Sequence, residues 1–239
     1  MIVEGKNAVR ELINSGATIN KFYVEKGLKD KQSNEIISLA KSKNIHVDFV
    51  SKEVIDKKSV SKRHQGFLCE TVNYEYCDID DILNEAHKRQ EPPFIVVLDK
   101  IEDPHNLGAI IRTCECAGVH GIVIPKHRAC QVNDTVLKTS VGAAINMKIA
   151  SVTNLNNTIE YLKNNNIWIY GLELGGKDIF TANLKGAIAL VVGSEGYGIS
   201  RLTKEKCDEI ISLKQNGKVN SLNASVACGI AVYEILKQR

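Results

Sequence analysis

Short apolar runs alternate with helical segments from Phe94 onward, and this alternation is the feature that most restricts the fold. The runs that predict strands are 94–98, 121–124, 147–150, 167–170, 187–192 and 209–213. Strands that are apolar on both faces, with helices between them, are typical of a parallel sheet covered on both sides. The sequence therefore predicts an α/β domain, and ligands in such domains bind beyond the carboxyl ends of the strands.

A smaller α/β unit is predicted before this domain. Apolar periodicity indicates helices around residues 8–13 and 36–40 and strands at 21–25, 45–50 and 66–71. Residues 73–77 lack a clear period and are the predicted linker. We therefore expect one domain at residues 1–72 and a second at residues 78–239, which opens with an amphipathic helix that Pro92 and Pro93 end.

Cysteine usage and hydropathy indicate the compartment. The seven cysteines are an odd set without a secretory signal, so we expect a reduced, cytoplasmic protein. The only close pair, Cys114 and Cys116, is a C-x-C in a helical pattern, unlike the C-x-x-C of structural zinc, so no metal site is expected. The longest apolar run, 187–192, is too short to span a bilayer, so no membrane segment is expected.

Positive charge is concentrated in the first 72 residues, which hold 13 Lys and Arg against 9 Asp and Glu, whereas residues 73–239 hold 18 against 19. The densest cluster contains Lys57, Lys58, Lys62, Arg63 and His64. One interpretation is that these side chains contact the phosphates of a nucleic acid. A solvated loop explains the same cluster equally well.

Three loops at the expected carboxyl ends of strands carry unusual side chains: residues 99–108, 193–198 and 214–223. In the first loop, Pro104 interrupts the regular secondary structure, and Asn106 is the expected cap of a new helix. Arg112 follows Gly108 by one helical turn, so we expect its stem to lie across the glycine and its guanidinium to point to the Asn106 end. A surface arginine near a helix start is the plainer alternative.

The last helix begins in the third loop. Asn220 or Ser221 is its expected cap, and the segment up to Leu236 is apolar on nearly every side, which predicts a helix that is buried all round. Asn223 and Ser225 place polar groups and free N–H donors at one end of an apolar core. Such an arrangement is typical of a binding site.

Two common ligand motifs do not occur in the sequence. The glycines of the second loop, Gly193, Gly196 and Gly198, are spaced as G-x-x-G-x-G and not as the G-x-G-x-x-G of dinucleotide folds. No G-x-x-x-x-G-K-[ST] phosphate loop is found either. A nicotinamide-dependent oxidoreductase is therefore disfavoured.

Three motifs carry a resemblance to a known family. They are Asn106-x-Gly108-x-x-x-Arg112, the turn Val192-Gly-Ser-Glu195-Gly, and Ser221-Leu-Asn223-Ala-Ser225-Val-Ala227. These segments resemble, in the same order, the signature motifs of the SpoU (TrmH-type) RNA ribose 2'-O-methyltransferases of the SPOUT superfamily. The resemblance extends over the whole chain, and the most similar group methylates a guanosine of 23S ribosomal RNA.

The resemblance implies a fold, a cofactor and a partner. Residues 1–72 would form an L30e-like RNA substrate-binding domain that includes His64-Gln65-Gly66, and residues 78–239 a SPOUT catalytic domain with a C-terminal trefoil knot. S-adenosylmethionine would be held at the matching positions, which are Gly193, Leu213, Leu222, Thr139 and Gly142. Family members are homodimers with the active site near the interface, which would place residues 228–236 at a dimer contact, although a monomer core explains the same apolarity.

The resemblance also implies catalytic roles. Family proposals make the arginine at Arg112 the base that removes the proton of the 2'-hydroxyl, but a guanidinium stays protonated and is a poor acceptor. In a second role, Arg112 grips the phosphate or sugar and stabilises developing charge, while Glu195 and Asn106 orient it. Asn223 and Ser225 would position the loop backbone and the ribose. The alternative for Glu195 is a turn residue that caps the helix after residue 200.

Three functions stay open at this point. A methyltransferase of 23S ribosomal RNA is favoured by the extra N-terminal domain, through analogy alone. Transfer RNA is the main competing substrate of the same reaction. A non-catalytic RNA-binding protein is disfavoured because Asn106, Arg112, Glu195 and Asn223 are all present.

Overall fold

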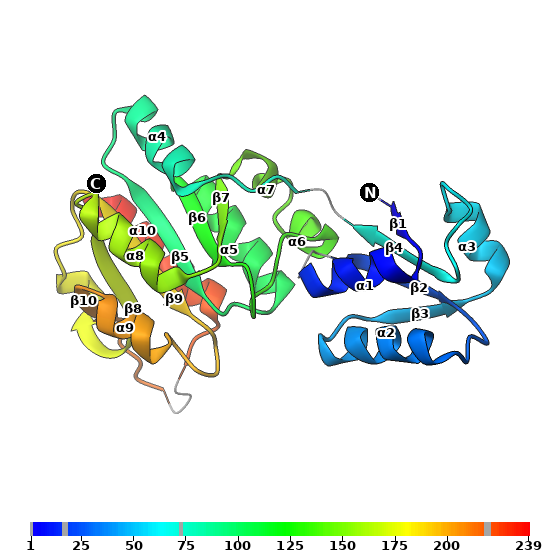
Figure 1. Ribbon diagram of the computed structural model, residues 1–239. Coiled ribbons are helices and arrows are strands. Elements are labelled where there is room, and N and C mark those ends of the chain that lie inside the picture. The colour runs from blue at the N-terminus through cyan, green and yellow to red at the C-terminus, as the bar shows by residue number, and fades with distance from the viewer. Residues whose placement is uncertain (1, 16–18, 72–73, 218–220) are drawn as a thin grey trace. The chain divides into compact units, whose positions relative to one another are not determined.

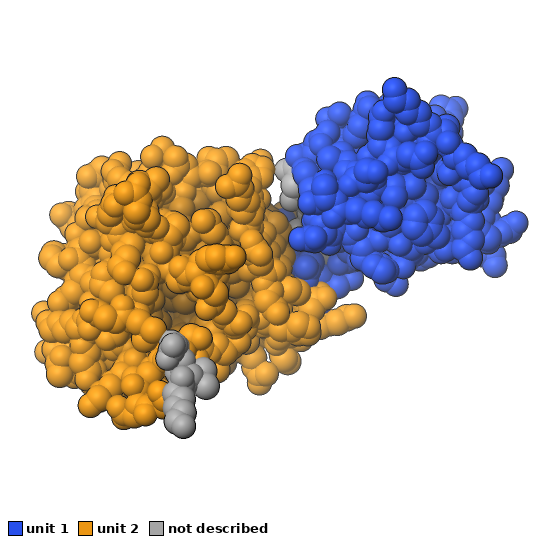
Figure 2. Space-filling view, turned by 90° about the horizontal axis from the view of Figure 1, so that it is seen from below, with its two compact units in different colours: residues 1–74, 132–134 blue, residues 75–131, 135–239 orange. Residues whose placement is uncertain are grey.

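The computed structural model describes residues 2–15, 19–71, 74–217 and 221–239. The chain divides into an N-terminal unit of residues 1–74 and 132–134 and a C-terminal unit of residues 75–131 and 135–239 (Figure 2). Each unit has its own sheet and its own hydrophobic core. None of the described helices has the length and apolarity that crossing a membrane requires.

A four-stranded sheet with the order β1-β4-β2-β3 forms the N-terminal unit. β2 and β3 are parallel, whereas β4 is antiparallel to both of its neighbours. In chain order the elements are β1 (Ile2–Glu4), α1 (Lys6–Ser15), β2 (Ile19–Glu25), α2 (Lys31–Ser42), β3 (Val47–Val50), α3 (Lys52–Lys58) and β4 (Phe67–Thr71) (Figure 1).

Helices cover both faces of this sheet. Because successive strand residues face opposite sides, Phe22 of β2 packs in the same cluster as α1 and α2, while the next residue, Tyr23, packs with Ile55 of α3. Two of these elements were not predicted from the sequence, β1 and α3. The last turn of α3 contains Lys57 and Lys58, so these two lysines lie on a helix and not in the predicted loop.

Six parallel strands form the sheet of the C-terminal unit, in the order β10-β8-β9-β5-β6-β7, which confirms the predicted α/β class. The strands are β5 (Phe94–Asp99), β6 (Gly121–Pro125), β7 (Ile149–Val152), β8 (Trp168–Asp178), β9 (Ile188–Gly193) and β10 (Glu209–Ser212). The helices are α4 (Ile79–Arg89), α5 (Pro104–Cys116), α6 (Asp134–Thr139), α7 (Ala143–Asn146), α8 (Leu155–Asn164), α9 (Arg201–Lys206) and α10 (Ala224–Gln238), with a short 3-10 helix η1 (Ile179–Thr181) (Figure 1).

The core of this unit lies around β5 and β9, which are buried at every residue. α4 and α8 cover one face of the sheet through Ile82 and Ile159. α5 and α10 pack against each other on the opposite face. Since each of these two helices follows a parallel strand, both begin at the carboxyl edge of the sheet.

Two predicted elements differ from the structure, and the predicted knot lies partly outside the described residues. β8 runs from Trp168 to Asp178 and not only over 167–170. The prediction was short because glycines and Glu173 interrupt the apolar pattern after Tyr170. α10 is not buried all round, since Val226 and Tyr233 are each 50% exposed. The C-terminal knot stays a prediction, because residues 218–220, before α10, lie outside the described residues.

Candidate active site

α5 begins directly after the carboxyl end of the central strand β5. Asp103 caps it, since Asp103 Oδ1 accepts the backbone N–H of His105 at 2.6 Å and that of Asn106 at 3.3 Å. Pro104 occupies the first helical position, where no N–H is needed. The prediction that Asn106 caps this helix is therefore wrong, and its side chain is available for other contacts.

α10 begins at the same edge of the sheet with its own side-chain cap. Asn223 Oδ1 accepts the backbone N–H of Ser225 at 3.0 Å, the N–H of Val226 at 3.3 Å and the hydroxyl of Ser225 at 2.6 Å. The cap is thus Asn223, and the prediction of Ser221 is wrong. The other predicted cap, Asn220, lies outside the described residues.

A carboxylate in the turn after β9 joins the two helix starts. Glu195 Oε1 accepts Asn106 Nδ2 at 2.9 Å and the backbone N–H of Ala224 at 3.3 Å. Asn223 Nδ2 donates to the same oxygen and to Asn106 Oδ1, the latter at 2.9 Å. Glu195 therefore contacts α10 and not α9, the helix that it would cap in the alternative interpretation.

We call Asn106, Glu195 and Asn223 the polar cluster. Glu195 and Asn223 are exposed and Asn106 is half-buried, so a large substrate can reach them. The carboxylate lies at the amino end of α10, where the helix dipole favours negative charge. The cluster thus presents fixed donors and acceptors of the kind that bind sugar hydroxyl groups.

Arg112 does not join the polar cluster. It lies six residues after Asn106, which is about 9 Å along the helix and about 120° around it. Its side chain is exposed and has no hydrogen bond or ion pair with the described residues. The space beside Gly108 is taken by α6, since a Cβ there would lie 2.6 Å from Thr139 Cβ and 3.1 Å from the Val136 oxygen. Close packing of α5 on α6, and not the stem of Arg112, therefore requires Gly108.

A cavity of 390 Å³ adjoins the polar cluster, within the range of about 300–1000 Å³ that is usual for small-molecule sites. The middle of β8, the carboxyl ends of β9 and β10 and the start of α10 form its wall. The wall residues are Leu172, Glu173, Leu174, residues 192–198, Leu213, Gln215, Ser221, Leu222, Ala224 and Ala227. Because Glu195 belongs to both the wall and the polar cluster, a molecule in the cavity would border a substrate held at the cluster.

The turn after β9 folds back on itself. Ser194 and Gly198 exchange two backbone hydrogen bonds, of 2.9 and 3.2 Å. A Cβ at Gly193 would lie 2.1 Å from the carbonyl carbon of Gly198, and Gly198 has a φ of 64°, so both positions require glycine. Ser194 Oγ is buried and has no hydrogen-bond partner among the described residues. A ligand in the cavity can satisfy such a group.

S-adenosylmethionine fits this site by its chemistry. The adenine ring of the cofactor needs an apolar slot, which Leu172 and Leu222 help to form. Its polar atoms need backbone groups and hydroxyls such as those of the turn after β9. Three of the predicted cofactor residues line the cavity: Gly193, Leu213 and Leu222. Thr139 and Gly142 are not part of its wall, because Thr139 packs on α5 and Gly142 precedes α7.

The part of the wall supplied by β8 was missed from the sequence. Leu172, Glu173 and Leu174 follow the predicted end of that strand. The parallel-sheet rule was the available signal, because the β8 residues at the end of its pairing with β9, Leu172 opposite Val192, lie beside the carboxyl end of β9. Glu173 has a further role, because its carboxylate accepts the N–H of Ile199 at 3.1 Å and Lys204 Nζ at 2.6 Å. These contacts fix the end of the turn that contains Glu195.

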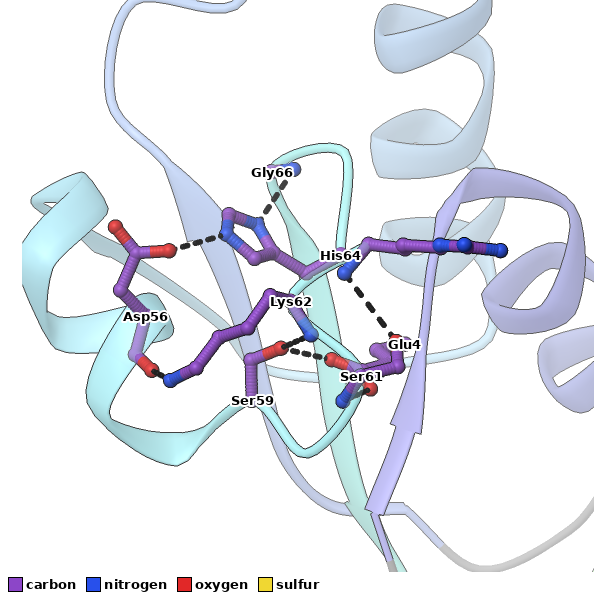
Figure 3. Close-up of polar contacts among 8 residues, drawn as sticks. Glu4, Asp56, Ser59, Ser61, Lys62, His64 and Gly66 are labelled. Carbon is purple, nitrogen blue, oxygen red and sulfur yellow. Dashed lines mark hydrogen bonds and ion pairs between the residues drawn. The ribbon is translucent and has the colours of Figure 1, made fainter.

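The loop between α3 and β4 of the N-terminal unit contains three of the predicted RNA-binding residues (Figure 3). His64 is buried, its Nδ1 accepts the N–H of Gly66 at 2.9 Å, and its Nε2 therefore donates to Asp56 Oδ1 at 2.9 Å. Lys62 Nζ donates to the backbone carbonyl of Asp56. Glu4 accepts hydrogen bonds from two further loop residues, Ser59 and Ser61.

The five predicted RNA-binding side chains are thus not equivalent. His64 and Lys62 hold the loop itself. Lys58 pairs with Glu70 at 2.8 Å, and its ammonium lies 5.0 Å from the centre of the Tyr23 ring. Lys57 and Arg63 are exposed, and their side chains have no hydrogen bond or ion pair with the described residues. Only these last two are free to meet a phosphate.

The cysteines are free thiols, and burial raises the pKa of several of them. Desolvation, aided by Asp208, raises the pKa of Cys207 to about 12. Burial also raises the pKa of Cys114 well above its ordinary value, with Cys228 beside it. In the part of the chain that the structure describes, no group of three or more His, Cys, Asp or Glu is placed to hold a metal ion.

Two family models match the chain. The SpoU rRNA Methylase family matches residues 93–233, the region that contains the cavity and the polar cluster. A model described as RNA 2'-O ribose methyltransferase substrate binding matches residues 2–77.

Proteins with similar sequences agree with these matches. YacO of Bacillus subtilis, which has the provisional name of a TrmH family tRNA/rRNA methyltransferase, is 43% identical over 99% of this chain and 95% of its own length. A Staphylococcus saprophyticus protein with the same family name is 43% identical over 100% of this chain and 96% of its own.

Solved structures share the fold. The SpoU methyltransferase AviRb of Streptomyces viridochromogenes, in complex with AdoMet, has a TM-score of 0.63 and 20% identity, over 100% of this chain and 90% of its own. The A. aeolicus TrmH/SpoU tRNA modifying enzyme has a TM-score of 0.57 and 28% identity, over 66% of this chain and 84% of its own. The family match over residues 93–233 and the whole-length identity show that the chain belongs to the SpoU family and is an S-adenosylmethionine-dependent RNA methyltransferase.

Proposed function

We propose that this enzyme methylates the ribose 2'-hydroxyl of a guanosine in 23S ribosomal RNA. The observation that carries the proposal is the polar cluster, which shares Glu195 with the wall of the cavity. The match to a model for RNA 2'-O ribose methyltransferase substrate binding supports ribose as the target. Support for 23S RNA comes from the sequence resemblance to the group that methylates it and from the rRNA methylase model.

The reaction defines what the protein must do. S-adenosylmethionine supplies a methyl group on a sulfonium sulfur. The ribose oxygen would form the new C–O bond as the C–S bond breaks, the sulfur would keep the electron pair as a neutral thioether, and the hydroxyl proton would pass to water. The protein must therefore hold the hydroxyl in line with that methyl group. We assign this task to Asn106, Asn223 and Ser225, with Glu195 fixing the two amides.

Arg112 acts in this proposal as a cation. A guanidinium stays protonated, so its contribution is to hold a phosphate or to stabilise negative charge that develops on the 2'-oxygen. Its face of α5 differs from that of Asn106, and the adjacent Thr113 faces α10, where its Cγ2 would lie 3.5 Å from a Cβ at Gly229. This placement, beside the seam of α5 and α10, is suited to action on RNA held by a second copy of the chain.

A homodimer is therefore part of the proposal. The exposed side chains of α10 include Val226, Ile230 and Tyr233, which are 50, 38 and 50% exposed. Their spacing of three to four residues places them in one apolar stripe along the helix. If a second copy packs its own apolar stripe against this one, both stripes are removed from water. The same packing would place Arg112 near the partner's polar cluster.

The N-terminal unit binds RNA outside the target nucleotide in this proposal, through Lys57 and Arg63. The division into domains at residues 1–72 and 78–239, joined by 73–77, remains our proposal, and residues 72 and 73 lie outside the described residues. We also propose a cytoplasmic location, which the free thiols support.

Transfer of labelled methyl from S-adenosylmethionine to unmodified 23S RNA, with bulk tRNA in parallel, tests the proposal. We expect label in 23S RNA as 2'-O-methylguanosine, its loss in Arg112→Ala, and no change in the control Lys88→Ala, an exposed position on α4. Transfer RNA is the second candidate, because the 28% identical A. aeolicus structure is named a tRNA modifying enzyme. Label in tRNA alone would keep the reaction and overturn the 23S substrate. Label in neither RNA would overturn free RNA as the substrate.

A further inference from the structure

Three exposed cations that the polar cluster does not use stand at the carboxyl edge of the C-terminal sheet. Lys100 follows β5, and Lys126 and Arg128 follow β6. In the parallel pairing of these strands Val97 lies opposite Val123. Lys100 and Lys126 each come three residues later, so they leave the sheet at the same level, about one strand spacing of 4.8 Å apart.

The same edge leads from these cations to the polar cluster. β9 pairs with β5 on the side away from β6, with Asp99 opposite Gly193. Glu195 follows two residues after Gly193. The turn that carries Glu195 thus lies about one strand spacing from the start of the Lys100 segment and about two, or roughly 10 Å, from the start of the Lys126 segment.

The segment that contains Lys126 and Arg128 is held firmly at both ends. Lys126 N–H donates to the Val152 carbonyl at 2.8 Å, at the end of β7. The N–H of Cys130 donates to the Ile101 carbonyl at 2.8 Å, which ties the segment to the one after β5. The side chain of Gln131 spans the base of the segment, because its Nε2 donates to the Pro125 carbonyl at 2.8 Å.

Two of the three cations lie on unfavourable backbone. Lys100 has a φ of 60° and Arg128 a φ of 56°. The left-handed conformation is unfavourable for a residue that has a Cβ. Neither side chain forms a hydrogen bond or ion pair with the described residues. No such contact therefore explains why a lysine and an arginine, and not glycines, occupy these two positions. Backbone strain of this kind is frequent at functional positions.

Acidic neighbours do not neutralise the three cations. Asp103 uses its carboxylate to cap α5. Glu102 is exposed and has no ion pair with a described residue within 4.0 Å. The segment from 126 to 131 contains no acidic residue. The cations are therefore available to an anion from outside.

We propose that Lys100, Lys126 and Arg128 form a phosphate-binding strip for the RNA backbone that flanks the target nucleotide. The inference rests on the proposed ribose site at the polar cluster, from which the strip runs along the same edge of the sheet. The strip belongs to the C-terminal unit and is distinct from the basic loop of the N-terminal unit. Its role is to position the RNA. Contacts from these cations to phosphates fix the register of the RNA on the protein, but they do not read the bases.

The test uses variants that remove charge without harming the fold. Lys100→Gly and Arg128→Gly place glycine where the backbone favours it, and Lys126→Ala removes an exposed side chain. Asn166→Gly, at a φ of 57° elsewhere in the same unit, is the control for glycine in this conformation. Lys88→Ala, in the last turn of α4 and so at the opposite edge of the sheet, is the control for charge.

RNA affinity is measured over a series of KCl concentrations, together with methyl transfer and S-adenosylmethionine binding. We expect the triple variant to lose about tenfold or more in RNA affinity and its salt dependence to fall by about 0.7–0.9 per contact. S-adenosylmethionine binding and kcat at saturating RNA should stay within about twofold, because the strip positions RNA and does no chemistry. Unchanged affinity and unchanged salt dependence would overturn the strip.

The same measurements separate this inference from the proposed function. Wild-type label in tRNA and not in 23S RNA would overturn the proposed substrate, and the salt series would then test the strip on tRNA. A triple variant with normal RNA affinity but low kcat would overturn the strip as an RNA-binding element while leaving the proposed reaction intact.

Discussion

Glu195→Gln tests whether the polar cluster orients the substrate. The change keeps the size of the side chain and one carbonyl oxygen, but it removes the charge that accepts three N–H groups, from Asn106, Asn223 and Ala224. Hydrogen bonds to a charged acceptor are worth about 1.5–3 kcal/mol, against about 0.5–1.5 kcal/mol for neutral ones. Because the cluster is exposed, water replaces much of what is lost. We expect the free energy of unfolding to fall by about 1 kcal/mol or less, mainly through the lost charge at the start of α10.

The effect on catalysis should exceed the effect on stability. The remaining neutral oxygen holds the two amides more weakly, so the ribose is positioned less precisely. We expect kcat at saturating RNA to fall by about 10- to 100-fold, as misplacement by about 1 Å does in other enzymes. Single-turnover methyl transfer measures this, and calorimetry with S-adenosylmethionine shows whether the cavity is intact. Glu205→Gln, exposed on α9, is the matched control. Wild-type kcat in Glu195→Gln would refute the positioning role, and loss of cofactor binding alone would assign Glu195 to the cofactor site.

Three further predictions concern the turn, the dimer and the thiols. Gly193→Ala places a Cβ 2.1 Å from the carbonyl carbon of Gly198, so the turn must open. Calorimetry should then show at least about tenfold weaker S-adenosylmethionine binding, and wild-type affinity would contradict the role of the turn. Tyr233→Asp puts a charge on the apolar stripe of α10 and should give a monomer in sedimentation; a wild-type protein that is itself monomeric would remove the basis of the homodimer. At pH 8 a thiol with a pKa of about 12, such as that of Cys207, is ionised in only about one molecule in ten thousand. Iodoacetamide should therefore label the exposed Cys116 first, and equal labelling of the two would contradict this burial.

The C-terminal sheet was predictable because its central strands are buried on both faces. β5 and β9 appear in the sequence as continuous apolar runs, which are typical of strands in a parallel sheet that helices cover on both faces. The same reasoning failed at the end of β8. Leu174 and Gly175 are exposed there, and Leu174 lines the cavity, so the apolar pattern stops before the strand does.

Helix caps were misplaced for a different reason. Asp103 and Asn106 are both good capping residues by type, and so are Ser221 and Asn223. The actual cap is the residue whose backbone is extended directly before the first helical turn, and this depends on how the preceding loop packs. Residue type therefore predicted where each helix begins to within a few positions. It did not predict which side chain accepts the first N–H groups of the helix.

The polar cluster could be named from the sequence only through the family resemblance. Its members are separated by 89 and 117 residues, and no spacing rule connects a helix start, a turn and a second helix start over such distances. What brings them together is the parallel sheet, which places the carboxyl ends of all its strands at one edge. Arg112 stays outside the cluster because its face of α5 differs from that of Asn106 by about 120°.

Charge counted along the chain is a poor guide to where RNA binds. The first 72 residues hold the excess of Lys and Arg, yet Lys58 and Lys62 already have acceptors in their own unit. A cation with an internal partner has part of its charge already offset, so we expect it to attract a phosphate less strongly than a free cation does. Arg63 and Arg128 have no such partner among the described residues, although one lies in the basic unit and the other in the near-neutral one. Arg63→Ala and Arg128→Gly should therefore each lower the salt dependence of RNA binding by about 0.7–0.9, and Lys58→Ala by much less. A large effect of Lys58→Ala, with little effect of the two arginine variants, would mean that net charge and not freedom from internal contacts decides where RNA binds.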